Sequence, residues 1–119
     1  MRNFKELKIW QKGFQLALNC YKLTSTFPAQ EKYGLVSQIN RAGVSIPSNI
    51  AEGSSRNSDK DYNRFIEFSL GSCFETETQL LIAKELGFGT NQLTDETLVL
   101  LVEEEKMLTA FSKSLLAKS

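Results

Sequence analysis

A row of polar side chains at helical spacing is the densest arrangement in the sequence that could do chemistry. Its members recur every three or four residues, so one face of a helix would carry them all: Gln38, Arg41, Ser45, Asn49 and Glu52. A second row with the same spacing follows and could face the first: Arg64, Ser72, Glu75 and Gln79. We expect ion pairs between these rows, such as Arg41 with Glu75 or Glu52 with Arg64, that fix helix register. The alternative is a ligand site built between facing helices.

Lysines form a second patterned set near the N-terminus. Four of them share one helical face with Gln15 and Asn19: Lys5, Lys8, Lys12 and Lys22. A basic face of this kind can contact the phosphates of RNA or DNA without reading their sequence. The plainer interpretation, which we favour for a neutral protein, is a solvated outer face.

The residues that usually perform catalysis at neutral pH are absent or isolated. The chain has no histidine, which excludes a His-containing catalytic triad and the usual zinc and di-iron sites of small domains. Its two cysteines, Cys20 and Cys73, lie in apolar rows, where a thiol behaves as a small hydrophobe. The run Glu103-Glu104-Glu105 points in three directions around a helix, which argues against a carboxylate cluster. We therefore expect no enzyme, no metal and no cofactor.

Length and charge limit the classes of protein further. The 119 residues make one domain, residues 1–119, with 14 basic and 14 acidic side chains and a formal net charge of zero. That balance excludes the strongly basic composition of a dedicated nucleic-acid binder. The longest uncharged stretch, residues 42–51, is too short to span a membrane, and the chain begins directly in amphipathic sequence. We expect a cytoplasmic protein that contacts no membrane.

Four segments with apolar residues at spacings of three and four must position these groups. The first begins at Asn3 and stops before Phe27-Pro28, the second covers residues 35–51 with Gly53 as its C-terminal cap, the third begins at Ser58 or Asp59 and ends before Gly87, and the fourth begins with Thr94 as its cap. No stretch shows the alternation of a strand. The sequence therefore predicts an all-α, antiparallel up-down-up-down four-helix bundle.

Pro47 lies inside the second segment, where its ring clashes with the carbonyl of Gly43, four residues earlier. Because Gly43 leaves the backbone room to relax, we predict a helix that is kinked at Pro47 and continues to Ala51. The alternative is two shorter helices broken at Ser45-Ile46.

The apolar surface exceeds what one four-helix bundle needs to bury. In the first helix the expected core row is Leu7, Trp10, Phe14, Ala17 and Tyr21, and a second row, Ile9, Gly13, Leu16, Cys20 and Leu23, lies beside it. The fourth helix is apolar all round between residues 98 and 102. We therefore predict a homo-oligomer of closed symmetry, with these candidate interface residues: Ile9, Leu16, Leu23, Val99 and Leu100.

The central motifs resemble a known family. They are Phe27-Pro28, Glu31-x-Tyr33-Gly34-Leu35-x-x-Gln38-x-x-Arg41-Ala42, Ser45-Ile46-Pro47-Ser48-Asn49-Ile50-Ala51-Glu52-Gly53, Arg56, Arg64-Phe65, Gly71-Ser72-x-x-Glu75 and Leu86-Gly87, with Phe4-x-x-Leu7-x-x-Trp10 at the start. Nearly the whole chain is similar to the four-helix-bundle proteins encoded in 23S rRNA intervening sequences of bacteria. That resemblance implies a ring, typically a homopentamer, with no established catalytic activity.

The chain is also distantly similar to the accessory variability protein of diversity-generating retroelements, which is a basic pentameric bundle that binds nucleic acid and reverse transcriptase. The neutral charge balance departs from that protein.

Three hypotheses about function follow. The first is a non-enzymatic, ring-forming interaction protein, whose partners beyond its own copies are RNA or another protein. The second is a nucleic-acid-binding accessory factor that uses the helix-one lysines. The third, which ranks last, is an enzyme built on Arg41, Asn49 and Glu52.

Overall fold

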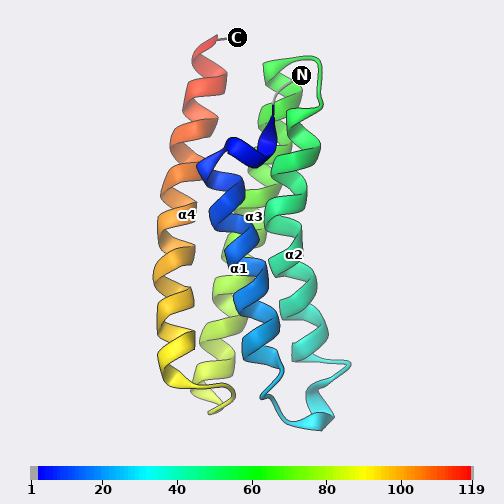
Figure 1. Ribbon diagram of the computed structural model, residues 1–119, viewed down its shortest axis with the longest axis vertical. Helices are drawn as coiled ribbons and strands as arrows, with labels where there is room; N and C mark the ends of the chain where they lie inside the picture. Colours follow the sequence, from blue (N-terminus) through cyan, green and yellow to red (C-terminus); the bar gives the residue numbers. More distant parts are fainter. Residues whose placement is uncertain (1–2, 119) are drawn as a thin grey trace.

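Four α-helices make up most of residues 3–118, the part of the chain that the computed structural model describes (Figure 1). They are α1 (Lys8–Thr24), α2 (Leu35–Ser54), α3 (Asp59–Glu85) and α4 (Asn91–Lys118), with two short 3₁₀ helices, η1 (Phe4–Glu6) and η2 (Ala29–Glu31). No strand occurs within residues 3–118. The prediction of an all-α four-helix fold is confirmed.

Neighbouring helices run in opposite directions, as the colours in Figure 1 show. Contacts between neighbouring helices show the same directions, because residue numbers rise along one helix while they fall along the other. The pairs are Cys20 with Gly43 and Thr24 with Asn40 between α1 and α2, and Ile46 with Ser69 and Gln38 with Gln79 between α2 and α3. They are Lys84 with Asp95 and Asn63 with Ser112 between α3 and α4, and Lys12 with Glu103 and Asn19 with Thr97 between α1 and α4. Helix α1 packs against α2 and α4, and α3 packs against the same two helices from the other side. The four helices therefore occupy the corners of a square.

Of the three predicted helix starts, one lies at its predicted capping residue and two differ. Asn3 Oδ1 accepts a hydrogen bond from Lys5 N at 3.2 Å, but this caps η1, and α1 begins only at Lys8. Ser58 Oγ accepts a hydrogen bond from Asp61 N at 3.0 Å and caps α3 as predicted. The expectation for Thr94 is wrong, because α4 already begins at Asn91 and the Thr94 hydroxyl donates to Thr90 O inside the helix.

Helix α2 is continuous from Leu35 to Ser54 with Pro47 inside it, which excludes a break at Ser45-Ile46. The kink stays a prediction. Gly53 is not a C-terminal cap, because the helix continues past it and its φ is not positive. Glycine is required there by packing: a Cβ atom would lie 2.8 Å from Phe65 Cβ and 2.9 Å from Tyr62 Cδ1.

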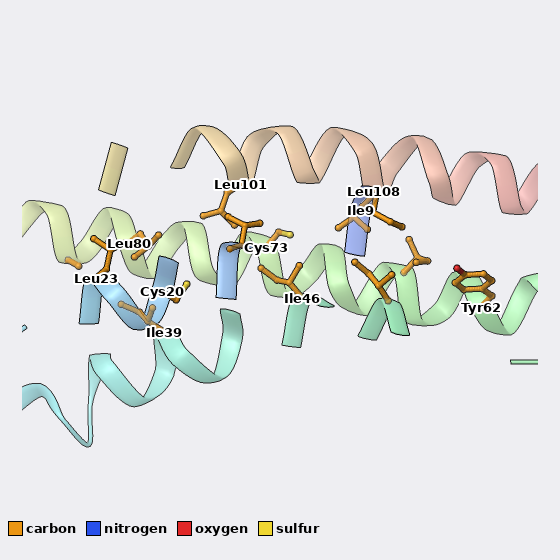
Figure 2. Packing of buried hydrophobic residues seen from close by; sticks show 14 of the residues in the cluster. Ile9, Cys20, Leu23, Ile39, Ile46, Tyr62, Cys73, Leu80, Leu101 and Leu108 are labelled. Atoms are coloured by element: carbon orange, nitrogen blue, oxygen red, sulfur yellow. The ribbon is translucent and has the colours of Figure 1, made fainter. Parts of the chain in front are cut away.

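The core lies along the centre of the square and reverses the expected roles of the two rows of α1 (Figure 2). Ile9, Leu16 and Leu23 are buried within the chain itself, so their assignment to an oligomer interface is wrong. The small residues of that row explain why it faces the core, because Gly13 and Cys20 let α2 approach α1 closely. The bulkier row that contains Phe14 and Tyr21 is turned outward.

The length and hydropathy of the four helices can be compared with those of a membrane span. Within residues 3–118, none combines the length and the apolar character that crossing a bilayer requires.

Candidate interaction surfaces

One exposed apolar face lies along α1 and α2. Ala17 faces Gly43 of α2, and Phe14 and Tyr21 stand three residues before and four residues after Ala17, on the same side of α1. The exposed members, each between 40% and 55% accessible, are Phe14, Leu18, Tyr21 and Val44. Rings extend this surface, since Trp10 stacks on Phe14 with centroids 5.1 Å apart. We call these four residues the α1/α2 apolar face.

A second exposed apolar face lies along α3 and α4. On α3, Leu81 stands between Glu77 and Lys84, both of which contact α4. On α4, Val102 stands three residues before Glu105, which contacts α3. The exposed members, between 38% and 59% accessible, are Phe74, Leu81, Val99 and Val102. We call these four residues the α3/α4 apolar face.

The two faces lie on opposite sides of the bundle. Helices α1 and α3 occupy diagonal corners, as do α2 and α4, because within residues 3–118 neither pair is in contact. A surface on the α1–α2 edge therefore looks away from a surface on the α3–α4 edge. Val99 is exposed, and its assignment to an interface stays a prediction, whereas Leu100 is half-buried against the core.

The predicted ion pairs between the polar rows do not form. Arg41 is exposed and makes no ion pair within residues 3–118, and Arg64 pairs with Asp61 of its own helix at 3.0 Å. Glu52 lies 3.7 Å from Arg56. The remaining contacts of the rows are local or weak: Ser45 to Arg41 O, Asn49 to Ser45 O, and Gln79 to Gln38 and Glu75 at 3.4 and 3.3 Å.

The ion pairs predicted between the two polar rows are missing for a geometric reason. The row on α2 lies on the outer flank of the helix, where long side chains reach water and residues of the same helix before they reach α3. Among the side chains of the second row that the structure describes, Gln79 alone bridges toward the α2 row, through Gln38.

Arginine and phenylalanine side chains cluster where α3 begins. The guanidinium carbon of Arg56 lies 4.5 Å from the centre of the Phe65 ring, and that of Arg64 lies 5.0 Å from the same ring. Asp61 contacts both guanidinium groups. The cluster therefore joins the α2–α3 turn to α3 with its charges largely balanced.

The lysines do not form one free stripe. Lys5 belongs to η1, outside α1, whereas Lys8 and Lys22 are exposed on α1. Lys12 is held at the seam with α4, where its Nζ lies 2.7 Å from Glu103 Oε1.

The two cysteines are buried free thiols, as predicted. Burial raises the pKa of Cys20 to about 12, and burial together with nearby glutamates raises the pKa of Cys73 as well. Neither thiol ionises readily, so neither is a nucleophile at neutral pH. Within residues 3–118, no three Cys, Asp or Glu side chains are grouped to hold a metal ion.

The acidic run Glu103-Glu104-Glu105 on α4 contains a buried carboxyl, that of Glu104, which the sequence analysis did not predict. Its three members do point in different directions: Glu103 pairs with Lys12, Glu105 meets Glu77 of α3, and Glu104 is fully buried at 0% exposure. Neither carboxyl oxygen of Glu104 has a hydrogen-bond partner within residues 3–118. The sequence held a signal for this burial, because Glu104 lies three residues after Leu101 and four before Leu108, both in the core.

Burial dominates the electrostatics of these carboxyls. It raises the pKa of Glu104 to about 8, although the positive charge of Lys12 lowers it in part. Burial also raises the pKa of Glu105 to about 8, and the hydrogen bond and negative charge of Glu77 add to the rise. Burial therefore shifts both carboxyls toward the protonated form.

Comparison with known proteins agrees with the resemblance read from the motifs. Residues 5–110 match the family described as 23S rRNA-intervening sequence protein. A crystal structure of a protein with unknown function from the S23 ribosomal protein family of Bacteroides thetaiotaomicron has a TM-score of 0.81 and 24% sequence identity, and the likeness covers 88% of this chain and 98% of that chain. At this identity the likeness shows the fold alone. No curated protein matches the chain.

Proposed function

Because the chain belongs to the family of 23S rRNA-intervening sequence proteins, we propose that it is a non-enzymatic interaction protein whose copies assemble into a closed ring. The resemblance implies five copies. One observation carries the proposal: two exposed apolar faces, one on α1 and α2 and the other on α3 and α4, lie on opposite sides of a single bundle.

Opposite apolar faces favour a ring over a dimer. Covering exposed apolar surface stabilises an assembly by about 25 cal/mol per Å² removed from water. If the α1/α2 apolar face of one copy covers the α3/α4 apolar face of the next, the first and last copies each keep one free face until the ring closes. If each face instead covered its own kind, each contact would be two-fold, and two different contacts would alternate along the assembly.

The interface we propose differs from the one predicted from sequence. Phe14 and Tyr21 take the place of Ile9, Leu16 and Leu23, which are core residues. On the opposite side, Val99 stays in the interface, together with Phe74, Leu81 and Val102.

Two charge-introducing variants test the direction of assembly. Phe14→Asp places a carboxylate on the first face and Leu81→Asp on the second, so each variant alone should lose the ring. Mixed in equal amounts, the two variants should form a heterodimer, because each retains the face that the other has lost. Light scattering after size-exclusion chromatography measures the mass of each sample.

Tyr33→Asp is the matched control, because Tyr33 is 88% exposed in the turn between α1 and α2 and belongs to neither face. It should leave the ring intact. A wild-type protein that is monomeric at micromolar concentration contradicts the ring, and a Leu81→Asp variant that still forms homodimers contradicts the contact between unlike faces.

The nucleic-acid alternative has weaker support from the geometry. Lys12 is already paired with Glu103 on the α4 side of α1, whereas Phe14 and Tyr21 lie on the α2 side. Helix α1 therefore does not bring its exposed rings and Lys12 together on one surface where bases could stack between basic side chains. Salt-sensitive retention of RNA that is lost when Lys5, Lys8 and Lys22 become glutamate would favour this alternative instead.

A further inference from the structure

Two adjacent carboxyls of α4 lie on either side of one lysine of α1. The Glu103 side chain is 51% exposed and forms an ion pair with Lys12 at 2.7 Å, while the Lys12 side chain is only 23% exposed. Glu104 is the next residue and lies inside the bundle with 0% exposure. The ammonium group therefore stands at the boundary between water and core, with one carboxyl outside it and one inside.

Glycine makes the room for the inner carboxyl. A Cβ atom at Gly13, the neighbour of Lys12 in the chain, would lie 3.1 Å from Glu104 Oε2 and 3.1 Å from Ile46 Cγ2. The carboxyl thus lies against the backbone of α1, beside an apolar wall from α2. Neither of its oxygens has a hydrogen-bond partner within residues 3–118.

The groups that face Glu104 leave it one source of positive charge. From α1 it faces Lys12, and from α3 it faces the neutral thiol of Cys73. Helix α2 contributes the apolar side chains of Ile46 and Pro47 near this point. On α4 itself, Glu103 is turned outward to Lys12 and Glu105 is turned to Glu77.

We propose that Lys12 moves between these two carboxyls in response to a single proton on Glu104. While Glu104 is neutral, Lys12 stays on Glu103 at the surface. When Glu104 gives its proton to water, the buried carboxylate draws the ammonium inward and Glu103 is left without its partner. The seam between α1 and α4 thus changes its surface charge without a change of fold.

The electrostatics place this exchange near physiological conditions. Burial raises the pKa of Glu104 to about 8, and the charge of Lys12 offsets part of that rise. An isolated carboxylate in a core is unfavourable by several kcal/mol, whereas a carboxylate paired with an ammonium is much less so. Lys12 is therefore the group that permits ionisation.

A carbon-detected NMR titration of protein labelled with ¹³C-glutamate and ¹³C-lysine tests the exchange directly. The Cδ signal of Glu104, assigned by its loss in Glu104→Gln, should titrate above pH 7. The Cε signal of Lys12 should follow the same midpoint in the wild type and lose that transition in Glu104→Gln. These measurements hold for a monomer or a ring alike, so they do not depend on the assembly proposed above.

Two variants separate an exchange from simple burial. Lys12→Met should raise the midpoint of Glu104 by about one pH unit or more, because the positive charge that lowers it is lost. Glu103→Gln should lower it, because Lys12 no longer has an outer partner. Lys8→Met, which removes an exposed lysine one turn earlier, is the matched control and should leave the midpoint unchanged.

The outcomes are decisive in both directions. A Glu104 midpoint near that of an exposed glutamate overturns the proposal, as does a midpoint above 7 that responds to neither Lys12→Met nor Glu103→Gln. Opposite shifts in those two variants support it.

Discussion

The α1–α4 seam and the α2–α3 seam hold the same bundle together by different means. Across the α1–α4 seam the contacts are polar: Lys12 to Glu103, Asn19 to Thr97, and the carboxyl of Glu104 against Gly13. Across the α2–α3 seam, Gly53 lies against Phe65 and Tyr62, and the buried hydroxyl of Ser69 donates to Ile46 O at 2.8 Å.

This difference shows how stability and response can be separated within one fold. The packed α2–α3 seam is destabilised by added side-chain volume, but its stability does not depend on a titrating group. The α1–α4 seam contains a buried carboxyl, so its stability changes with pH while its packing volume stays the same. We therefore expect substitutions to act on one seam through packing and on the other through protonation.

The largest expected effect is the pH dependence that Glu104 imposes on the α1–α4 seam. Burial raises its pKa to about 8 in the folded chain, while a glutamate in an unfolded chain titrates near ~4.3. Between these values the folded state binds more protons, so the free energy of unfolding falls as pH rises, by up to about 1.4 kcal/mol per pH unit. The contribution is complete below pH ~4.3 and is lost as pH passes about 8.

Urea unfolding followed by circular dichroism from pH 5 to pH 9, at one protein concentration, measures this slope. Glu104→Gln should reduce this slope, leaving the part that Glu105 contributes, and should be more stable than the wild type at pH 9. Glu85→Gln, which neutralises an exposed carboxyl near the end of α3, should keep the wild-type slope. Equal slopes in the wild type and in Glu104→Gln would show that the buried carboxyl is ionised throughout.

The second effect sharpens the packing side of the comparison. Gly53→Ala places a Cβ atom 2.8 Å from Phe65 Cβ and 3.2 Å from the backbone oxygen of Tyr62, so α2 and α3 must move apart. We expect a loss of about 2–3 kcal/mol in the free energy of unfolding. In Gly71→Ala, where a Cβ meets nothing within 4 Å, we expect a gain of about 1 kcal/mol from helix propensity. A gain in stability in both variants would mean that α2 and α3 can move apart at Gly53 without a loss of packing energy.

A smaller effect tests the buried hydroxyl of Ser69, which bridges α3 to α2. Ser69→Ala removes the donor to Ile46 O and should lower the free energy of unfolding by about 1 kcal/mol, with little dependence on pH. Thr78→Ala removes an exposed hydroxyl that bonds only within its own helix and should change stability by less than about 0.5 kcal/mol. Thermal and urea unfolding of the two variants give the comparison. Equal losses would show that burial of the Ser69 bond adds nothing.

Periodicity in the sequence was enough to predict the helices, because spacings of three and four are a local property of each segment. It was not enough to choose the buried face of α1, where apolar residues cover about half the circumference. That choice depends on a tertiary fact: the row with Gly13 and Cys20 admits the backbone of α2, whereas the row with Phe14 and Tyr21 does not.

The candidate site was predicted less well, for a related reason. Spacing places Arg41 and Glu75 on helix flanks, but it does not say whether two flanks are close enough for their side chains to meet. For Glu104, the positions of Leu101 and Leu108 pointed to burial, but charge is normally a sign of exposure. A buried acid is recognised only when the space around it is known.

The smallest effect is expected at Arg41, where the sequence alone predicted an ion pair with Glu75. Arg41→Ala removes an exposed side chain that makes no ion pair within residues 3–118, and the main-chain carbonyl that accepts from Ser45 is kept. Arginine and alanine both favour helices, so the free energy of unfolding should change by less than about 0.5 kcal/mol and the mass in solution should not change. A loss above about 1 kcal/mol that disappears when Glu75 is also replaced by alanine would show that the two side chains pair across the α2–α3 seam in solution. In that case charge would contribute to both seams, and the division between a packed seam and a titrating seam would be wrong at this point.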